Sequence, residues 1–218
     1  MIRSLPHGKP TRMDLSPPAP RRILHVGCGA ASADKLPAHF FPAGEWQEIR
    51  LDLDPSVAPD IIASITDMAA VPDGFVDAVW SSHNLEHLFP HEVPQALAEF
   101  RRVLTPEGFA LMTMPDLQQV AALVAADLLT EAAYMSPMGP ITPLDMLYGH
   151  GASLAQGNAF MGHRGGFTAR SLEAALQEAG FPIVRVVKDA SFALWATAYK
   201  GPIKAAAGPT QAPLRGGA

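Results

Sequence analysis

The sequence predicts an α/β fold, a doubly wound and mostly parallel sheet of seven strands that ends in an antiparallel hairpin. Strand-like apolar runs alternate with segments of helical periodicity, which is typical of a parallel sheet with helical crossovers. The last two strands are joined by Asp189-Ala190-Ser191 alone. This connection is too short for a parallel crossover, so these two strands are expected to be antiparallel neighbours.

The expected strands are short runs rich in aliphatic, β-branched and aromatic residues. They are Arg22 to Val26, Gln47 to Leu53, Ile61 to Ile65, Val76 to Ser81, Gly108 to Met114, Ile183 to Lys188 and Phe192 to Tyr199. The first of these runs contains the aliphatic and β-branched stretch from Ile23 to Val26, and a near-continuous apolar run is what a buried parallel strand requires.

Three amphipathic helices are expected between these strands. The first carries Val93, Leu97, Phe100 and Leu104 at helical spacing, with Pro94 in the first turn, where proline is tolerated. The second follows the capping residue Asp116 and carries Leu117, Val120, Leu123, Val124 and Leu128. The third begins after the N-cap Thr168 and ends just before Gly180. Its residues Leu172, Leu176 and Ala179 face inward.

One domain with two tails is expected from the length of 218 residues. Residues 1–20 and 201–218 are rich in proline, glycine or alanine and lack a periodic apolar face, so we expect flexible tails around a domain of residues 21–200. A long insert at about residues 130–167 takes the place of what would be a brief connection, and such inserts are usually functional.

The composition excludes several classes of function. A net charge of -5 argues against a nucleic-acid partner, which would call for clustered Lys and Arg. The single cysteine, Cys28, cannot form an internal disulfide, which fits a reducing compartment. No apolar run reaches membrane-spanning length and the first residues lack the apolar core of a secretory signal, so we expect a cytoplasmic protein without a membrane partner.

A glycine turn and an acidic residue together predict a nucleotide cofactor. The run Ile23-Leu24-His25-Val26-Gly27-Cys28-Gly29 ends on glycines, which let the backbone approach a ligand where a Cβ would collide. Asp52 follows about 25 positions later, at the end of the next strand, where a carboxylate can accept the hydrogen bonds of a ribose diol. Asp54 shares its face and is interpreted as a turn former before Pro55.

These motifs, in this order, resemble the class I S-adenosylmethionine-dependent methyltransferases, whose fold is Rossmann-like with an antiparallel seventh strand. The matching segments are Val26 to Gly29, Asp52 to Pro55, Asp67 to Pro72, Phe75 to Trp80, Ser82 to Leu88 and Glu99 to Gly108. The resemblance covers residues 21–116 closely and 168–200 in outline. It implies S-adenosyl-L-methionine as cofactor, held by Gly27, Cys28, Gly29, Asp52, Leu53, Asp67, Met68 and Ser82.

The chain departs from that family in two places. Residues 30–45 contain Pro37, Pro42 and Gly44, which leave room for only about a turn or two of the helix that usually follows the first strand. Glu107 stands at a turn position where the family often has glycine. For Asp67, a structural alternative is an N-cap of the short turn that follows.

His83 and Asn84 are the candidate catalytic residues, since they follow the fourth strand at the edge where open α/β sheets bind ligands. His83 is expected to act as a general base, or else to cap a loop. Asn84 is expected to orient an acceptor oxygen, or else to tie the turn. The insert is interpreted as a lid that offers Tyr134, Tyr148, His163 and Arg164 to a small-molecule acceptor, or alternatively as the contact of a homodimer.

The same residues suggest a rival metal site. His83-Asn84-Leu85-Glu86-His87 spells H-x-x-E-H, which on a helix can place two zinc ligands and a general base together. Pro90, however, interrupts any helix that would also carry His91, and the sequence defines no third ligand. We therefore expect no metal, with Glu86 and His87 bridging the strand and the next helix.

Three functional hypotheses follow from the sequence. The first is a methyltransferase that acts on a small molecule, and the second is a catalytically silent relative that serves as a binding or assembly module. The third is a nicotinamide-dependent oxidoreductase, which is weakened because Gly27-Cys28-Gly29-Ala30-Ala31-Ser32 lacks the closing glycine or alanine of the dinucleotide motif.

Overall fold

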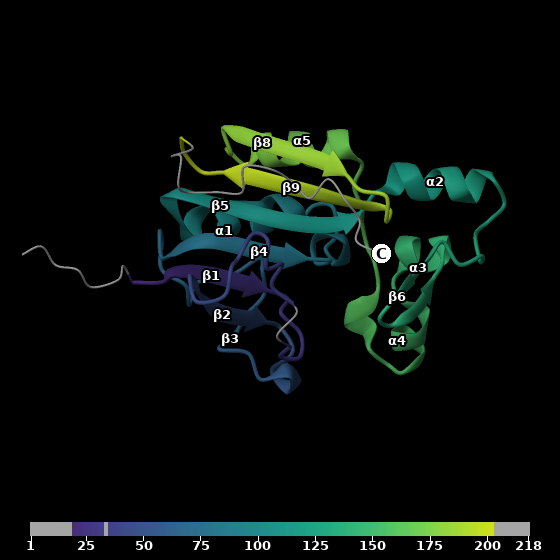
Figure 1. Cartoon of the computed structure of the whole chain (residues 1–218), viewed down its shortest axis with the longest axis horizontal. Coiled ribbons are helices and arrows are strands. Elements are labelled where there is room, and N and C mark those ends of the chain that lie inside the picture. Colours follow the sequence, from purple (N-terminus) through teal and green to yellow (C-terminus); the bar gives the residue numbers. More distant parts are fainter. Residues whose placement is uncertain (1–18, 33–34, 203–218) are drawn as a thin grey trace, which may run out of the picture.

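The computed structural model describes residues 19–32 and 35–202 (Figure 1). The predicted tails therefore lie outside the described residues, apart from residues 19–20 and 201–202. Among the helices that are described, none combines the length and the apolar character needed to cross a membrane.

The main sheet has seven strands in the order β3-β2-β1-β4-β5-β9-β8. The strands are β1 (Arg21–Val26), β2 (Trp46–Asp52), β3 (Ile61–Ile62), β4 (Val76–Ser82), β5 (Leu104–Pro115), β8 (Ile183–Lys188) and β9 (Ala193–Tyr199). Strands β1 to β5 pair with one another in parallel, whereas β9 is antiparallel to both β5 and β8. The predicted fold, including its terminal hairpin, is confirmed.

The three predicted helices are α1 (Val93–Val103), α2 (Leu117–Ala125) and α5 (Ala169–Glu178). Asp116 caps α2 by accepting a hydrogen bond from the Gln118 amide, and Thr168 caps α5 by accepting one from the Ser171 amide. Leu104 begins β5 instead of ending the first helix. The predicted strand from Ile61 to Ile65 is reduced to two residues.

Helices α1 and α5 pack on the same face of the sheet. Leu97 and Phe100 of α1 and Leu172 and Leu176 of α5 share one hydrophobic cluster with residues of β1, β4, β5 and β9. The opposite face is covered by Phe40 and Phe41, which lie in the connection between β1 and β2. Residues 35–45 contain no helix, which is less than the turn or two for which the prolines were expected to leave room.

The insert forms a small substructure at one end of the sheet. It contains the hairpin β6 (Tyr134–Ser136) and β7 (Gly139–Ile141), the short helices α3 (Pro143–Tyr148) and α4 (Gly151–Ala155), and the 3-10 turn η3 (Ala159–Met161). Figure 1 shows α3, β6 and α4 beyond the arrowheads of β1, β4 and β5. The insert therefore lies at the carboxyl edge of the parallel strands, where ligands of such sheets bind.

Candidate active site

Two cavities open at the carboxyl edge of the sheet. The larger measures about 380 Å³ and is lined by residues that follow β1, β2, β3 and β4, together with Asn158, Phe160, Met161 and Arg164 of the insert. The smaller measures about 270 Å³ and is lined by the ends of β4 and β5, by the turn between β8 and β9, and by Tyr134 and Met146 of the insert. His83 lines both cavities.

The glycine turn after β1 is held in place by two side chains. Gly27 and Gly29 have φ angles of +58° and +57°, which glycine adopts without strain. The Asn84 amide nitrogen donates to the Val26 carbonyl at 2.7 Å, and a Cβ on Gly27 would collide with the Asn84 side chain. The Asp52 carboxylate accepts a hydrogen bond from the Gly29 amide at 2.7 Å. Asn84 thus ties the turn, which was one of its two predicted roles.

The two acidic residues at the end of β2, Asp52 and Asp54, have different hydrogen-bond partners. Asp52 and Asp54 both line the larger cavity, with Leu53 between them. Asp54 accepts a hydrogen bond from the Ser56 amide and caps a 3-10 turn, η1 (Pro55–Val57), as expected of a turn former. The hydrogen bonds from Ser56 lower the pKa of Asp54.

Other predicted cofactor residues lie elsewhere. Cys28 is buried and lines a separate cavity with His25 and Lys35, because the turn directs its side chain away from the larger cavity. Met68 is buried in the core, and its amide donates to the Glu99 carboxylate at 2.7 Å. Asp67 is exposed and accepts a hydrogen bond from the Ala69 amide. Ser64, Ile65 and Thr66 line the larger cavity in their place, and Ser82 lines the smaller one.

His83 is held by a buried carboxylate. Its Nδ1 lies 3.1 Å from Glu86 Oε1, and the side chains of His83 and Glu86 are 48% and 1% exposed. His83 has a φ of +52°, an unusual value outside glycine. Burial lowers the pKa of His83, but the hydrogen bond and the charge of Glu86 outweigh this effect, so the pKa is raised. Burial raises the pKa of Glu86, but His83 and His87 lower it below its ordinary value.

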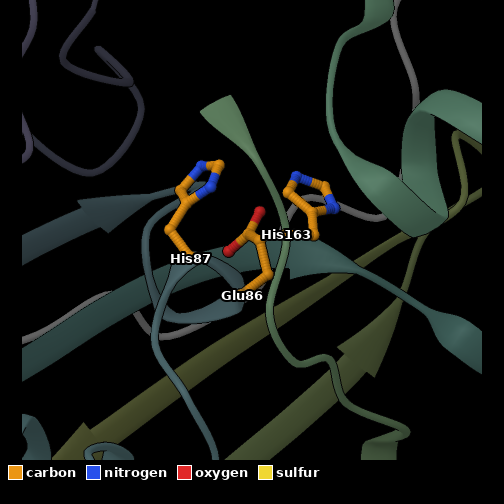
Figure 2. A group of neighbouring side chains, drawn as sticks. All are labelled: Glu86, His87 and His163. Carbon is orange, nitrogen blue, oxygen red and sulfur yellow. The ribbon is translucent and has the colours of Figure 1, made fainter. Parts of the chain in front are cut away.

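The four insert residues predicted to contact an acceptor are dispersed. Tyr134 lines the smaller cavity, and Arg164 lines the larger one with its guanidinium 4.8 Å from the centre of the Phe89 ring. Tyr148 is 63% exposed and lines neither cavity. His163 faces Glu86 and His87, as Figure 2 shows.

Sequence reasoning missed most residues of the smaller cavity. Thr113, in β5, is buried there with a hydroxyl that has no hydrogen-bond partner among the described residues. Asp189, Phe192 and Trp195 line the same cavity from the terminal hairpin, and Asp189 accepts a hydrogen bond from Trp195 Nε1. The only sequence signal for Thr113 was that it is a polar residue near the carboxyl end of an otherwise apolar strand.

Comparison with known proteins identifies the fold. Residues 24–112 match the family model of a methyltransferase domain. A malonyl-[acyl-carrier protein] O-methyltransferase of Laribacter hongkongensis is 31% identical over 139 residues, which are 51% of this chain and 45% of that protein. The chain therefore spans about half the length of this curated relative.

Two solved structures illustrate the similarity of fold. A S-adenosylmethionine-dependent methyltransferase from Archaeoglobus fulgidus superposes with a TM-score of 0.53 at 15% identity, covering 83% of this chain and 86% of that one. A 1,6-didemethyltoxoflavin-N1-methyltransferase from Burkholderia thailandensis, solved with bound S-adenosylhomocysteine, gives a TM-score of 0.50 at 16% identity, covering 84% and 72% of the two chains.

The strand order, the antiparallel β9 and the glycine turn beside Asp52 define a nucleotide-binding α/β fold of the methyltransferase class. Residues 24–112 match a methyltransferase domain, and the chain shares the fold of the S-adenosylmethionine-dependent methyltransferases. S-adenosylmethionine is the cofactor of this family.

Proposed function

We propose that the protein transfers a methyl group from S-adenosylmethionine to a small-molecule acceptor. The observation that carries this proposal is the pair of cavities that meet at His83, one beside the glycine turn and one between the sheet edge and the insert. Donor and acceptor need separate pockets that open onto each other, because methyl transfer proceeds in line between them.

The larger cavity suits the cofactor. Each oxygen of the Asp52 carboxylate accepts one backbone amide hydrogen bond, from Gly29 and from Asp54. A carboxylate has about four acceptor positions, so both oxygens retain capacity for a ribose diol. Gly27 and Gly29 line the part of this cavity that would take the methionine end of the cofactor, and Ser64 to Thr66 supply the wall nearest β3.

The smaller cavity suits the acceptor. Its volume of about 270 Å³ is near the lower end of small-molecule sites, and its walls combine the rings of Tyr134, Phe192 and Trp195 with the unpaired hydroxyl of Thr113. A nucleophilic atom of the acceptor would form a bond to the methyl carbon while the carbon–sulfur bond breaks and its electrons return to sulfur. An acceptor hydroxyl or amine would pass its proton to His83, whereas a carboxylate would need no base.

The insert is proposed to act as a lid over these cavities. Its residues Phe160, Met161 and Arg164 line the larger cavity, and Tyr134 and Met146 line the smaller one. Hydrogen exchange within residues 130–167 is expected to slow when S-adenosylhomocysteine is added. Equal exchange with and without this compound would favour the homodimer contact instead, which the exposed side chains of Met135, Met138 and Tyr148 support.

Calorimetric titration with S-adenosylmethionine, S-adenosylhomocysteine and NAD tests the cofactor assignment. The proposal requires binding of the first two. Binding of neither would favour the silent binding or assembly module, for which the absence of a helix in residues 35–45 is the supporting observation. The nicotinamide hypothesis loses its basis with the methyltransferase fold.

A radiolabelled methyl donor then identifies the acceptor. Small hydroxyl, amine and carboxylate compounds form the screen, and carboxylates are tested first because the Laribacter relative is named as an O-methyltransferase of a malonyl group. The proposal retains the expectations of a cytoplasmic location and no nucleic-acid partner. Label appearing only in a nucleic acid or protein would contradict the small-molecule acceptor.

A further inference from the structure

Glu86, His87 and His163 place three metal-binding side chains together beside the larger cavity (Figure 2). One ligand atom from each of them lies within 4.8 Å of the other two. The sequence motif offers His83 and His87 as zinc ligands with Glu86 as a base, and the argument against it is that Pro90 interrupts the helix and no third ligand is defined. Folding supplies that ligand from the insert, far along the chain.

Each imidazole lies with its Nδ1 near a backbone carbonyl. His87 Nδ1 lies 3.1 Å from the Gly162 carbonyl, and His163 Nδ1 lies 3.0 Å from the Met146 carbonyl. A carbonyl oxygen only accepts hydrogen bonds, so Nδ1 carries the proton in both rings. The Nε2 lone pairs are therefore available, and a hydrogen bond from the other ring nitrogen is what fixes the tautomer in known metal sites.

Glu86 offers a buried carboxylate oxygen that lacks a partner. Its Oε1 is bonded to His83 Nδ1, whereas its Oε2 has no hydrogen-bond partner among the described residues. An unpaired oxygen on a carboxylate that is 1% exposed is costly, and a cation is the usual compensation for such a group.

The backbone holds the three ligands in place. The amides of Arg164 and Gly165 both donate to the Glu86 carbonyl, at 2.8 and 3.1 Å. The rings of His87 and His163 meet edge to face with their centres 4.9 Å apart. These contacts connect the insert to the 3-10 turn η2 (Leu85–His87) that follows β4. The cluster is therefore part of the folded structure and does not depend on flexible surface side chains.

We propose that Glu86, His87 and His163 bind one divalent transition-metal ion, with zinc as the first candidate. Two imidazole nitrogens and one carboxylate oxygen suit Zn²⁺ and its first-row neighbours, whereas Mg²⁺ and Ca²⁺ prefer oxygen ligands. Ligands of tetrahedral zinc lie about 3.4 Å apart, so each donor atom would move by less than about 1 Å toward the ion.

The proposed ion would connect the insert to the sheet edge. Because His87 also lines the larger cavity, the ion would lie at the wall of that cavity. A fourth coordination position remains open on a four-coordinate ion held by three residues. Metal binding is therefore expected to slow hydrogen exchange in the segment 142–164, which carries His163 and the carbonyl groups that orient both imidazoles.

Titration of the full-length protein, first freed of metal with EDTA, tests this site. Calorimetry with Zn²⁺ is expected to give one tight site per chain, and the visible absorption of bound Co²⁺ is expected to show four- or five-coordination. Glu86→Gln and His163→Ala are each expected to weaken Zn²⁺ binding at least about 100-fold, since even the loss of an outer hydrogen-bond partner costs about 10–100-fold. His91→Ala is the matched control, because His91 is exposed and stacks on Phe89 near the site.

Thermal melting in EDTA verifies that each variant is folded, and His87→Ala replaces any variant that is not. The proposal is overturned if the wild-type protein binds no stoichiometric metal ion, or if His163→Ala binds Zn²⁺ as tightly as the wild type. Neither measurement uses cofactor or acceptor, so the result is independent of the proposed methyl transfer.

Discussion

Asp52 both binds backbone amides and lines the larger cavity, which makes it the most informative single residue of the proposed cofactor site. Its carboxylate accepts the amides of Gly29 and Asp54, and so it connects the turn after β1 with the turn after β2. The same side chain lines the larger cavity. A substitution there will affect both the shape of the turn and the contacts available to a ribose.

Replacing Asp52 by Ala is expected to weaken S-adenosylmethionine binding by ~1.5–3 kcal/mol, because charged hydrogen bonds are lost and polar groups are left unpaired. Calorimetric Kd values measure the change. Asp54→Ala is the comparison, since Asp54 lines the same cavity but bonds only within its own turn. An unaltered Kd for Asp52→Ala, with a weakened one for Asp54→Ala, would transfer the ribose contact to Asp54. Melting curves separate lost binding from lost folding.

Replacing His83 by Ala is expected to lower turnover by ~10²–10⁴-fold on a hydroxyl or amine acceptor, the range for removing a general base. The Kd of S-adenosylmethionine is expected to change little, because His83 lies where the two cavities meet and bonds to Glu86. Single-turnover rates and calorimetry measure the two quantities. Normal turnover would show that His83 is a structural loop residue and that methyl transfer depends on proximity alone.

At the scale of elements, Glu99 and Arg102 attach the segment before β4 to helix α1. Glu99 accepts hydrogen bonds from the Met68 amide and from Arg102, and Arg102 donates to the carbonyls of Met68 and Val71. The hydrogen bond from Arg102 lowers the pKa of Glu99. A salt bridge of this kind, mostly shielded from solvent, orders a segment that has no regular structure of its own.

Glu99→Gln is expected to lower the free energy of unfolding by ~1–2 kcal/mol near neutral pH. Because folding lowers the pKa of Glu99, its contribution is complete above the unfolded pKa of about 4.3 and is lost as the pH falls through the folded pKa. The difference between wild type and variant is therefore expected to shrink in acid, as urea unfolding at several pH values can measure. Asp73→Asn is the control, since Asp73 also pairs with Arg102 but is 81% exposed. An equal effect at acid and neutral pH would contradict the assignment.

The elements that sequence predicts best are those with their own local signals. Helix α5 has the N-cap Thr168 and a glycine after its end, and strand β8 has the bounds expected from its apolar run. Strand β3 is shorter than predicted because a turn begins at Ser64. The Ser64 hydroxyl accepts a hydrogen bond from the Thr66 amide, and the Ser64 carbonyl accepts one from the Asp67 amide. Such side-chain competition is not visible in an apolar run.

In the candidate site, too, some residues could be predicted from local sequence signals and others could not. Gly27, Asp52 and His83 could be predicted because the ends of adjacent parallel strands meet at one edge. The direction in which Cys28 and Met68 point could not be predicted, because strand alternation ends where the turns begin. Thr113 and His163 reach the site only through tertiary packing of β5 and of the insert. Long-range packing of this kind leaves no local pattern in the sequence.

At the scale of the whole molecule, the two faces of the sheet are covered in different ways. The face with α1 and α5 has a mostly aliphatic core that includes Phe100, Phe167 and Phe181. The other face has an aromatic layer, in which Phe41 packs against Trp46 and stacks on Phe109, and Phe40 stacks on Trp195. The connection between β1 and β2, which has no helix in residues 35–45, thus covers this face as α1 and α5 cover the first one.

Phe41→Ala is therefore expected to destabilise the protein by ~3–5 kcal/mol, as deletion of a core phenylalanine does, although Phe41 lies outside any helix or strand. Phe41 is 4% exposed, and its ring centre lies 5.1, 6.4 and 6.1 Å from those of Trp46, Trp80 and Phe109. Urea unfolding measures the change, with Phe100→Ala as the reference on the opposite face. Phe160→Ala removes the same atoms from a residue that is 59% exposed, and it is expected to change stability by no more than about 0.5 kcal/mol. A loss below about 1 kcal/mol for Phe41→Ala would show that the connection is not part of the cooperative core, and that the aromatic face of the sheet is stable without it.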